Sequence, residues 1–330
     1  MYRVCHGERF GPGGQLGKYW VGPKIAAGAR GSVYYASDAS ADCSKPNAAV
    51  KHPATNREVR TMTALHDGSS PCLGVPLILD TGKFGDRDKP FVVTELLGAP
   101  LMLIFQKMAL LSPRAKWEVI CIIGRLLLRR LQAIHERGFV HCDINPTNVL
   151  MGRRLGAGTE RCMPFFIDFG LAHPHPGGDP IQPHAGTIEY NSIRSGDGGP
   201  RLPCDDLEAL GWMLLHGLCG RLPWFSTIAS VSWSDKPRRA VMVKQVQQIK
   251  ADTLESGLAG LQDAPEEMVQ YLMLCRSFGG QTDDGAAARP DYAALAQLLG
   301  DTAPPAADES EKEKEDLNRL AKFMLSWGGV

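Results

Sequence analysis

The chain has 330 residues, and 44% of them are hydrophobic, so it holds enough apolar side chains for one large core or two smaller ones. Its 36 Lys and Arg residues balance its 36 Asp and Glu residues, and the formal net charge of zero argues against nucleic acid or an anionic membrane as a general electrostatic partner. The 9 cysteines are scattered without a C-x-x-C pair, which is typical of a reduced protein rather than of a disulfide scaffold.

Targeting and metal-binding signals are weak along the whole sequence. The first residues contain no apolar signal region, and no apolar run reaches the length of a membrane span. We therefore expect an intracellular protein, cytoplasmic or nuclear, without a membrane span. His173, His175 and His184 lie close together, but no neighbouring Cys or His completes the spacing of a zinc site.

The first feature in chain order is a Gly-rich hairpin that follows a polar lead-in over residues 1–18. A strand is predicted from Tyr19, and the run from Ile25 to Tyr35 reads I-A-A-G-A-R-G-S-V-Y-Y. It matches the pattern G-x-G-x-x-G-x-V, except that Ala26 replaces the first glycine. Glycines let a backbone approach a phosphate group closely, although any Gly-rich hairpin has a similar pattern. The residues expected to contact a nucleotide here are Ile25, Gly28, Gly31 and Val33.

The next predicted strand ends in a lysine. The run Ala49–Lys51 is followed by a segment that carries Glu58 and then apolar residues at helical spacing. A lysine at a strand end is usually a solvated surface charge. The hairpin before it and the acidic helix after it favour an ion pair between Lys51 and Glu58, with the lysine holding the phosphates of a nucleotide. Ala49 is expected to contact the same nucleotide.

Further strands are predicted over residues 73–79 and 89–97. The second would cross from the first part of the protein to the second, and its backbone can pair with an adenine ring. Thr94 is then the small residue at the back of the nucleotide pocket. A buried strand followed by a loop is the alternative, and the two interpretations are compatible. The contact residues expected here are Thr94, Glu95 and Leu97.

A long helix is predicted to begin at Ser112 and Pro113. Serine is a favoured N-cap residue and proline is favoured in the first turn of a helix. The apolar stripe of this helix consists of Ile120, Ile123, Leu127, Leu131 and Ile134. Because the spacing is that of one helix face, we expect this stripe to pack into the core rather than to carry chemistry.

The two most informative stretches follow this helix. The first reads H-C-D-I-N-P-T-N-V-L over residues 141–150, and the second reads F-F-I-D-F-G over residues 165–170. Their spacing matches the catalytic loop H-R-D-L-x-x-x-N and the metal-binding loop D-F-G of a phosphoryl-transfer site. Such a site works mainly by positioning and charge neutralisation, so it needs few residues but needs them together.

The two stretches supply the polar groups that phosphoryl transfer requires. Asp143 has the place of the base that accepts the proton of an attacking hydroxyl. Asn148 and Asp168 carry oxygen atoms, which Mg²⁺ prefers as ligands. We therefore predict ATP and Mg²⁺ as cofactors, with Leu150 as a further nucleotide contact. His141 is expected to be a packed structural histidine, because the aspartate performs the acid–base chemistry.

A short segment over residues 171–186 is rich in Pro, Gly and His and leads into the run G-T-I-E-Y. A buried helix is predicted to open at Asp205, with apolar positions at Leu207, Leu210, Gly211, Leu214, Leu215 and Leu218. Asp206 is expected to cap this helix, or to hold the backbone of the catalytic loop from below. The basic cluster over residues 236–239 is most often a solvated turn, and its alternative role is docking of a substrate or a phosphate.

The end of the chain differs in character from the rest. A mixed, acid-leaning charge run over residues 308–316 leads into a short amphipathic pattern formed by Leu317, Leu320, Ala321, Met324 and Leu325. An isolated helix of this length is marginal in water. We therefore expect it to dock, either on its own domain or on a partner protein.

Taken together, these motifs resemble the protein kinases, and within them the casein kinase 1 group, most of all the vaccinia-related kinases of poxviruses and animals. The resemblance covers about residues 19–300. Its specific marks are E-L-L-G at 95–98 followed by Leu101, G-T-I-E-Y at 186–190, D-D-L-E-A-L-G at 205–211, L-P-W at 222–224 and R-P-D-Y at 289–292.

The resemblance implies an α+β, bilobal fold and an activity. The expected units are a lead-in over 1–18, a β-rich N-lobe over 19–97, a helical C-lobe over 98–300, and a charged linker with a tail helix over 301–330. The implied activity is ATP-dependent phosphorylation of Ser or Thr on a protein substrate. Cys142 stands where many kinases have an arginine, which implies an enzyme that does not need phosphorylation of its activation segment.

One departure from the family pattern affects the predicted chemistry. Protein Ser/Thr kinases carry a lysine two residues after the catalytic aspartate, and this chain has Asn145 there. We include Asn145 among the catalytic residues, because an amide can donate a hydrogen bond to the transferring phosphate, but it brings no charge. Loss of one transition-state donor costs about a hundredfold to a thousandfold in rate.

Two other functions fit parts of the sequence. Asn145 and Ala26 together are compatible with a pseudokinase, a scaffold that binds nucleotide or partners with weak or no transfer. The H-x-D…N loop with an asparagine in this place also occurs in small-molecule phosphotransferases of the aminoglycoside or choline kinase type. The G-T-I-E-Y run and the helix with Asp206 favour a peptide-accepting surface over a metabolite site.

Overall fold

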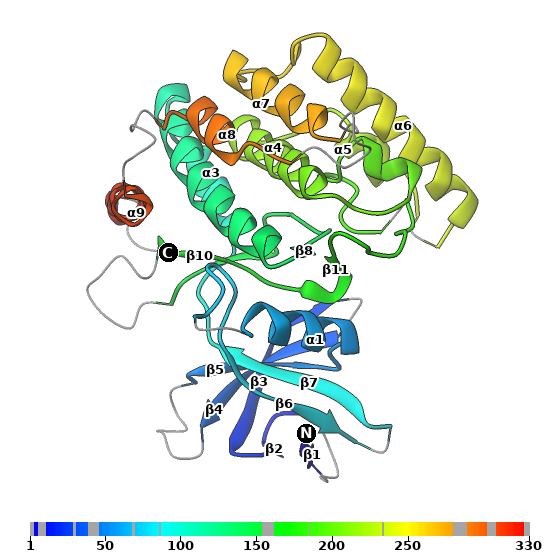
Figure 1. The fold of residues 1–330 in the computed structure, drawn as a ribbon, viewed down its shortest axis with the longest axis vertical. Coiled ribbons are helices and arrows are strands. Elements are labelled where there is room, and N and C mark those ends of the chain that lie inside the picture. The colour runs from blue at the N-terminus through cyan, green and yellow to red at the C-terminus, as the bar shows by residue number, and fades with distance from the viewer. Residues whose placement is uncertain are drawn as a thin grey trace.

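The computed structural model describes residues 3–5, 11–28, 31–38, 46–67, 70–85, 87–153, 162–183, 185–232, 234–279, 289–301 and 308–326. The chain folds as an α+β protein, as predicted, with a curled sheet at one end and a helical body at the other (Figure 1). The tip of the predicted Gly-rich hairpin (residues 29–30), His184 and residues 302–307 of the predicted linker lie outside the described residues.

The sheet at the N-terminal end has the order β1-β6-β7-β5-β4-β3-β2. Its strands are β1 Arg3–Cys5, β2 Gln15–Leu16, β3 Tyr19–Gly28, β4 Gly31–Asp38, β5 Ala48–His52, β6 Ile78–Phe84 and β7 Lys89–Glu95. Neighbouring strands run antiparallel, apart from β1, which is parallel to β6. One face of the sheet buries its own small core, which includes Val50, Phe91 and Val93. Helix α1 (Asn56–Leu65) packs on β6 and β7 and turns Val59 and Met62 inward.

Within the predicted lead-in over residues 1–18, the structure adds two strands, β1 and β2, to the sheet. One strand prediction was wrong. The strand predicted over 73–79 begins only at Ile78 and continues to Phe84. The residues before it turn at Gly74, which has a φ of +75°, and Val75 donates a backbone hydrogen bond to Cys72. The polar residues of β6 concealed its course, since they give no clear apolar alternation.

The helical body is built around two buried helices. Its helices are α2 Leu101–Met108, α3 Pro113–Glu136, α4 Pro203–Cys219, α5 Phe225–Ala229, α6 Lys236–Glu255, α7 Glu266–Ser277, α8 Tyr292–Leu298 and α9 Glu309–Ser326. The short strand pairs are β8 Phe139–Val140 with β11 His173–Pro174, and β9 Val149–Met151 with β10 Pro164–Phe166. None of the helices in the described part of the chain is long and apolar enough to cross a membrane.

Helices α3 and α4 confirm the predicted periodicities. The Ser112 side chain accepts a hydrogen bond from the Ala115 backbone and caps α3, whose predicted apolar stripe is buried throughout. In α4 the predicted apolar positions are likewise buried. Helix α2 was not predicted, since it is only 8 residues long and its N-cap, Pro100, offers no side-chain cap. The basic cluster 236–239 forms the exposed first turn of α6, capped by Asp235.

Helix α9 docks on its own chain, which was one of the two predicted alternatives. It lies beside α3 (Figure 1), and Leu317, Leu320 and Met324 are buried there. Asp316, 4% exposed, accepts hydrogen bonds from the guanidinium groups of Arg125 and Arg129. One α9 face therefore adds both apolar contacts and a buried carboxylate to the outer side of α3.

We expect Asp316→Ala to lower the free energy of unfolding by about 3 kcal/mol, because it leaves the buried Arg125 guanidinium without its counter-charge. Urea unfolding monitored by tryptophan fluorescence measures the change. The matched control is Arg319→Ala, which removes an ion pair with Glu118 at 3.1 Å between groups that are 40% and 51% exposed. This second change should cost less than about 1 kcal/mol. Equal effects of the two variants would contradict the structural role of Asp316.

Candidate functional site

A cavity of about 890 Å³ lies where the sheet meets the helical body. Its wall includes every residue predicted to contact a nucleotide or a metal: Ile25, Gly28, Gly31, Val33, Ala49, Lys51, Glu58, Thr94, Glu95, Leu97, Asn148, Leu150 and Asp168. These residues come from β3, β4, β5, α1, β7 and the loop after it, β9, and the loops next to β9 and β10. The structure therefore gathers residues that are as far as 143 positions apart, from Ile25 to Asp168, around one space.

A lysine bridges two acidic side chains on the wall of this cavity. The Lys51 Nζ atom lies 2.7 Å from Glu58 Oε1 and 2.9 Å from Asp168 Oδ1. Burial lowers the pKa of Lys51, but the two carboxylates more than offset this, so its pKa lies above the ordinary value. Burial also raises the pKa of Glu58, against the opposing effect of Lys51. The predicted Lys51–Glu58 pair is confirmed, and it extends to the second acidic loop.

The local fold explains why these three groups meet. Strand β5 presents Lys51 at its end, and Thr55 caps α1 by accepting a hydrogen bond from the Glu58 backbone. Asp168 has a left-handed backbone with a φ of +61°, which is uncommon for a residue with a Cβ atom. Its side chain accepts a hydrogen bond from Gly170 N at 3.3 Å, while Phe169 is fully buried behind it. The strained turn thus points the carboxylate at Lys51.

The loop that carries Asp143 is fixed from below by α4. The two Asp206 carboxylate oxygens accept hydrogen bonds from His141 N at 2.7 Å and Cys142 N at 2.9 Å. This fixes Cys142 in a left-handed conformation with a φ of +69°, immediately before Asp143. His135 lies 3.0 Å from the same carboxylate. The role predicted for Asp206 as a support of this loop is confirmed.

Asp143 faces polar partners on both of its oxygens. Thr187 Oγ1 donates to Asp143 Oδ1 at 2.7 Å, and Asn148 Nδ2 donates to Asp143 Oδ2 at 3.1 Å. Asp143 is 7% exposed and does not line the large cavity, but its partner Asn148 does. The carboxylate therefore lies one side chain away from the predicted phosphate site.

The Asn145 side chain forms hydrogen bonds within its own loop. Its Oδ1 atom accepts hydrogen bonds from Thr147 N at 3.0 Å, Thr147 Oγ1 at 2.6 Å and Asn148 N at 3.1 Å. Its Nδ2 atom donates to Thr187 Oγ1 at 2.9 Å, and the residue is 3% exposed. Asn145 thus closes the turn between Asp143 and Asn148, in the manner of an Asx turn. A direct contact between Asn145 and a transferring phosphate stays a prediction.

His141 packs as predicted. It is fully buried, its Nε2 atom lies 3.0 Å from the Ile167 carbonyl oxygen, and its ring contacts those of Phe166 and Phe169. In the segment over residues 171–186, His173 contacts Arg57 through Nε2 at 2.8 Å. Among the described residues, no group of three or more His, Cys, Asp or Glu side chains could hold a metal ion.

The oxygen atoms of Asn148 and Asp168 nevertheless fit Mg²⁺ of the kind that arrives with a polyphosphate. Mg²⁺ usually keeps several waters and takes only one or two protein carboxylates besides the phosphate oxygens. Asp168 supplies a carboxylate that is 27% exposed on the cavity wall, and Asn148 adds an amide beside it. The donor set is therefore suited to a shared metal ion.

Thr187 is the functional residue that the sequence reading did not single out. It follows Gly186, which has a φ of +84°, and a Cβ atom on that glycine would lie 2.8 Å from the Cys142 carbonyl oxygen. Only a glycine lets the segment approach the loop closely enough for Thr187 to reach Asp143. A Gly-Thr pair at the end of a Pro- and Gly-rich segment is the sequence signal that could have indicated it.

A buried lysine secures the same segment from its other side. Lys250 of α6 donates hydrogen bonds to the carbonyl oxygens of Ile188 at 3.0 Å and Asn191 at 2.6 Å. It lies over the ring of Trp224 at 5.1 Å. Burial lowers the pKa of Lys250 to about 7, against the opposing charges of Glu208 and Glu189. The segment that carries Thr187 is therefore held on both sides.

No model of a known protein family matches this chain, so its function is inferred from the geometry described above.

We expect Asp206→Ala to reduce the free energy of unfolding by about 2 to 4 kcal/mol, because two buried backbone N–H groups lose their acceptor. Although burial raises the pKa of Asp206, hydrogen bonding to His135 and to the loop lowers it below the ordinary value. A depressed carboxyl pKa stabilises the fold above the unfolded-state pKa and loses this effect as the pH falls.

The difference in stability between wild type and Asp206→Ala should therefore be constant from neutral pH to about pH 5 and shrink below about pH 4. Urea unfolding across this pH range gives the measurement. Asp197→Ala serves as control, because it removes an exposed pair with Lys244 and should change stability by less than about 1 kcal/mol. A difference that grows at low pH would show that the folded carboxyl has a raised pKa.

Proposed function

We propose that this chain is an ATP-dependent protein serine/threonine kinase that transfers the γ-phosphate to a hydroxyl of a protein substrate. One observation carries the proposal: Lys51 joins Glu58 and Asp168 on the wall of one cavity that also contains the Gly-rich hairpin. The ion pairs link a strand end, a helix and a loop that are distant in sequence. This is the arrangement that phosphoryl transfer from a nucleotide requires.

The proposed kinase function would divide the molecule into two lobes. The sheet with α1 would be the N-lobe over residues 19–97 together with β1 and β2, and the helical body would be the C-lobe from residue 98 onward. Its support is the position of the cavity, whose wall draws on strands β3, β4, β5 and β7 on one side and on Asn148, Leu150 and Asp168 on the other.

ATP would place its adenine against the backbone of residues 94–97 and its phosphates beneath β3 and β4. Lys51 would hold the phosphate oxygens, oriented by Glu58. Asn148 and Asp168 would hold Mg²⁺, which neutralises phosphate charge when it is bound. The small side chain of Ala49 leaves room for the base, and Ile25, Val33 and Leu150 offer apolar surface to its faces.

The transfer step would use Asp143. The oxygen of a substrate hydroxyl forms a bond to the γ-phosphorus while the bond from that phosphorus to the β–γ bridging oxygen breaks, and ADP leaves. Asp143 accepts the hydroxyl proton on one carboxylate oxygen. Thr187 and Asn148 orient this carboxylate through hydrogen bonds at 2.7 and 3.1 Å. An intracellular protein with a Ser or Thr acceptor is the substrate class proposed.

A nucleotide-binding scaffold is the second candidate function, and the structure of the Asn145 turn favours it. The Asn145 amide already has hydrogen-bond partners on both its oxygen and its nitrogen. It therefore adds no charge, and no uncommitted side chain, next to a transferring phosphate. If no other cation takes that role, transfer would be slowed by about a hundredfold to a thousandfold.

We expect Asp143→Asn to reduce phosphate transfer to a generic Ser/Thr acceptor by about 100- to 10,000-fold, because it removes the base. The affinity for Mg·ATP should stay within a few-fold of wild type, since Asp143 does not line the nucleotide cavity. Radiolabel transfer and isothermal titration calorimetry measure the two quantities. Lys51→Met should instead weaken nucleotide binding, and Asp235→Asn, at the exposed cap of α6, should change neither.

Three outcomes separate the candidates. Wild-type transfer that exceeds Asp143→Asn supports the kinase. Nucleotide binding with no transfer above that variant supports the scaffold. Phosphorylation of small hydroxyl compounds with none of proteins would assign the chain to the small-molecule phosphotransferases.

We expect Thr187→Val to lower kcat by about 10- to 100-fold, because it removes the hydrogen bond that orients Asp143. Thr187→Ser keeps the hydroxyl and should retain kcat within about threefold. The KM for ATP should be unchanged in both, as Thr187 does not line the nucleotide cavity. Steady-state kinetics at saturating peptide tests this, and an equal loss in both variants would show that Thr187 acts only through packing.

A further inference from the structure

A second pocket, of about 560 Å³, opens on the other side of the catalytic loop. It is bounded by α2, the loop with Asn145, the segment with Thr187, the last turn of α4 and the region around α5. The proposed transfer chemistry does not use it. Its size is that of a site for a small ligand or for one or two side chains of a bound peptide.

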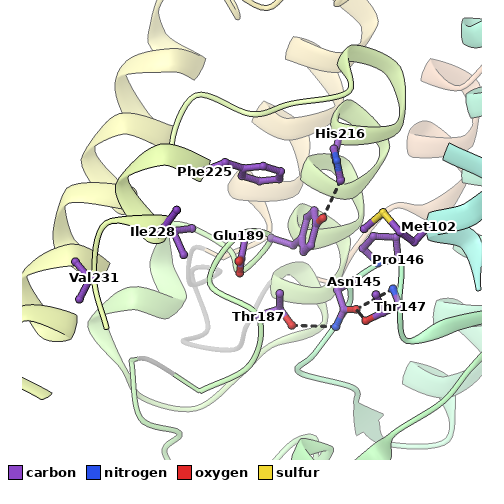
Figure 2. A pocket seen from close by; sticks show the side chains of 12 residues that line it. Met102, Asn145, Pro146, Thr147, Thr187, Glu189, His216, Phe225, Ile228 and Val231 are labelled. Atoms are coloured by element: carbon purple, nitrogen blue, oxygen red, sulfur yellow. Dashed lines mark hydrogen bonds between the residues drawn. The ribbon is translucent and has the colours of Figure 1, made fainter. Parts of the chain in front are cut away.

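Most of the pocket wall is apolar. Figure 2 shows Phe225 and Ile228 on one side and Met102 and Pro146 on the other, with Asn145, Thr147 and Thr187 closing the end toward the catalytic loop. The remaining wall is formed by Glu189, Tyr190, His216, Ala229 and Val231. Phe225 lies edge-on to the His216 ring, at 5.0 Å between ring centroids.

The polar groups of the wall are largely satisfied within the protein. Tyr190 OH lies 2.7 Å from His216 Nδ1, a contact drawn as a dashed line in Figure 2. Burial lowers the pKa of His216, which favours its neutral form. Glu189 is the acidic residue of this wall, and its backbone oxygen accepts a hydrogen bond from Trp224 Nε1 at 2.8 Å. A ligand would therefore meet an apolar surface with a negative charge at one place.

The pocket is continuous with the transfer site. Thr187 and Asn145 both line it, and Thr187 Oγ1 donates to Asp143 Oδ1 at 2.7 Å. An extended peptide advances about 3.3 Å per residue and turns successive side chains to opposite sides. When an acceptor hydroxyl reaches Asp143, a side chain within about four positions of it comes to lie over this pocket.

We propose that this pocket selects protein substrates that carry a large apolar side chain, such as Phe or Leu, within four positions of the phosphorylated Ser or Thr, and that disfavour an acidic one there. The inference rests on the proposed kinase function. The apolar wall binds the side chain by removing its surface from water, and the Glu189 carboxylate repels an acidic residue. Tyr190 and Phe225 shape the pocket for a bulky group.

The test uses the full chain and a set of Ser-acceptor peptides in an Ala and Gly background. Each peptide carries one Phe, Leu, Ala, Lys or Asp at a single position from four before to four after the serine. Two quantities are measured for each: kcat/KM for phosphate transfer, and the dissociation constant in the presence of Mg·ADP by fluorescence anisotropy. We expect one position at which Phe or Leu exceeds Ala by about 10- to 100-fold in kcat/KM, with Asp lowest.

Two substitutions at Ala229 test whether the pocket is responsible. Ala229 lines the pocket and is exposed, so Ala229→Phe fills the space without disturbing the core. This variant should reduce the preference to about twofold. Ala229→Asp adds a second negative charge and should shift the preference toward Lys. Ala240→Phe, at an exposed position of α6 outside the pocket, is the matched control and should keep the wild-type preference.

The two readouts distinguish the inference from the function on which it rests. An apolar preference in transfer that only the Ala229 variants change supports both. Transfer to all peptides alike, or a preference unchanged in both Ala229 variants, overturns the pocket assignment and leaves the kinase in place. Selective peptide binding that Ala229→Phe removes, without any transfer, supports the pocket and overturns the kinase. Neither transfer nor selective binding overturns both.

Discussion

The conformation of the loop that carries Asp143 depends on the buried carboxylate of Asp206. A charge that is fully removed from water is costly unless hydrogen bonds compensate it, and here two backbone N–H groups and His135 do so. Its place in the first turn of α4 adds the favourable end of the helix dipole. The same bonds hold Cys142 at a positive φ. The direction of Asp143 is thus set by a helix that also packs in the core and contributes His216 to the smaller cavity.

The two cavities share one wall. Asn148 faces the larger cavity and Asn145 the smaller, and the turn between them is closed by the Asn145 side chain. Asn145 carries no charge, and its hydrogen bonds hold the turn between the two cavities in place. Thr187 donates to Asp143 and accepts from Asn145, so two hydrogen bonds join the outer segment to the loop.

Most of the correct predictions came from hydrophobic periodicity and from short spacings along the sequence. The α3 stripe, the α4 core face and the Lys51–Glu58 pair follow from spacing in the chain, and each is present in the structure. The course of β6, helix α2 and the partners of Asn145 were missed. The residues of β6 and α2 give weak local signals of their own, whereas the contact of Thr187 with Asp143 joins segments 44 positions apart, which no local pattern reveals. The motifs picked out residues that the structure brings together around the larger cavity, whereas the hydrogen bonds of Asn145 and Thr187 could be seen only in three dimensions.

Helix α9 is tied to the rest of the fold by buried contacts. Its Glu313 pairs with the fully buried Arg130, whose chain packs against Gly74 beside the sheet and whose Nε donates to the Pro164 carbonyl oxygen. The Arg130 guanidinium thereby links the acidic face of α9 to the junction where the sheet joins the helical body. A shortened protein that stops after α8 would expose apolar surface on α3 and would remove the α9 carboxylates that pair with three arginines, Arg125, Arg129 and Arg130. In the structure, α9 is therefore a part of the folded unit rather than an appendage to it.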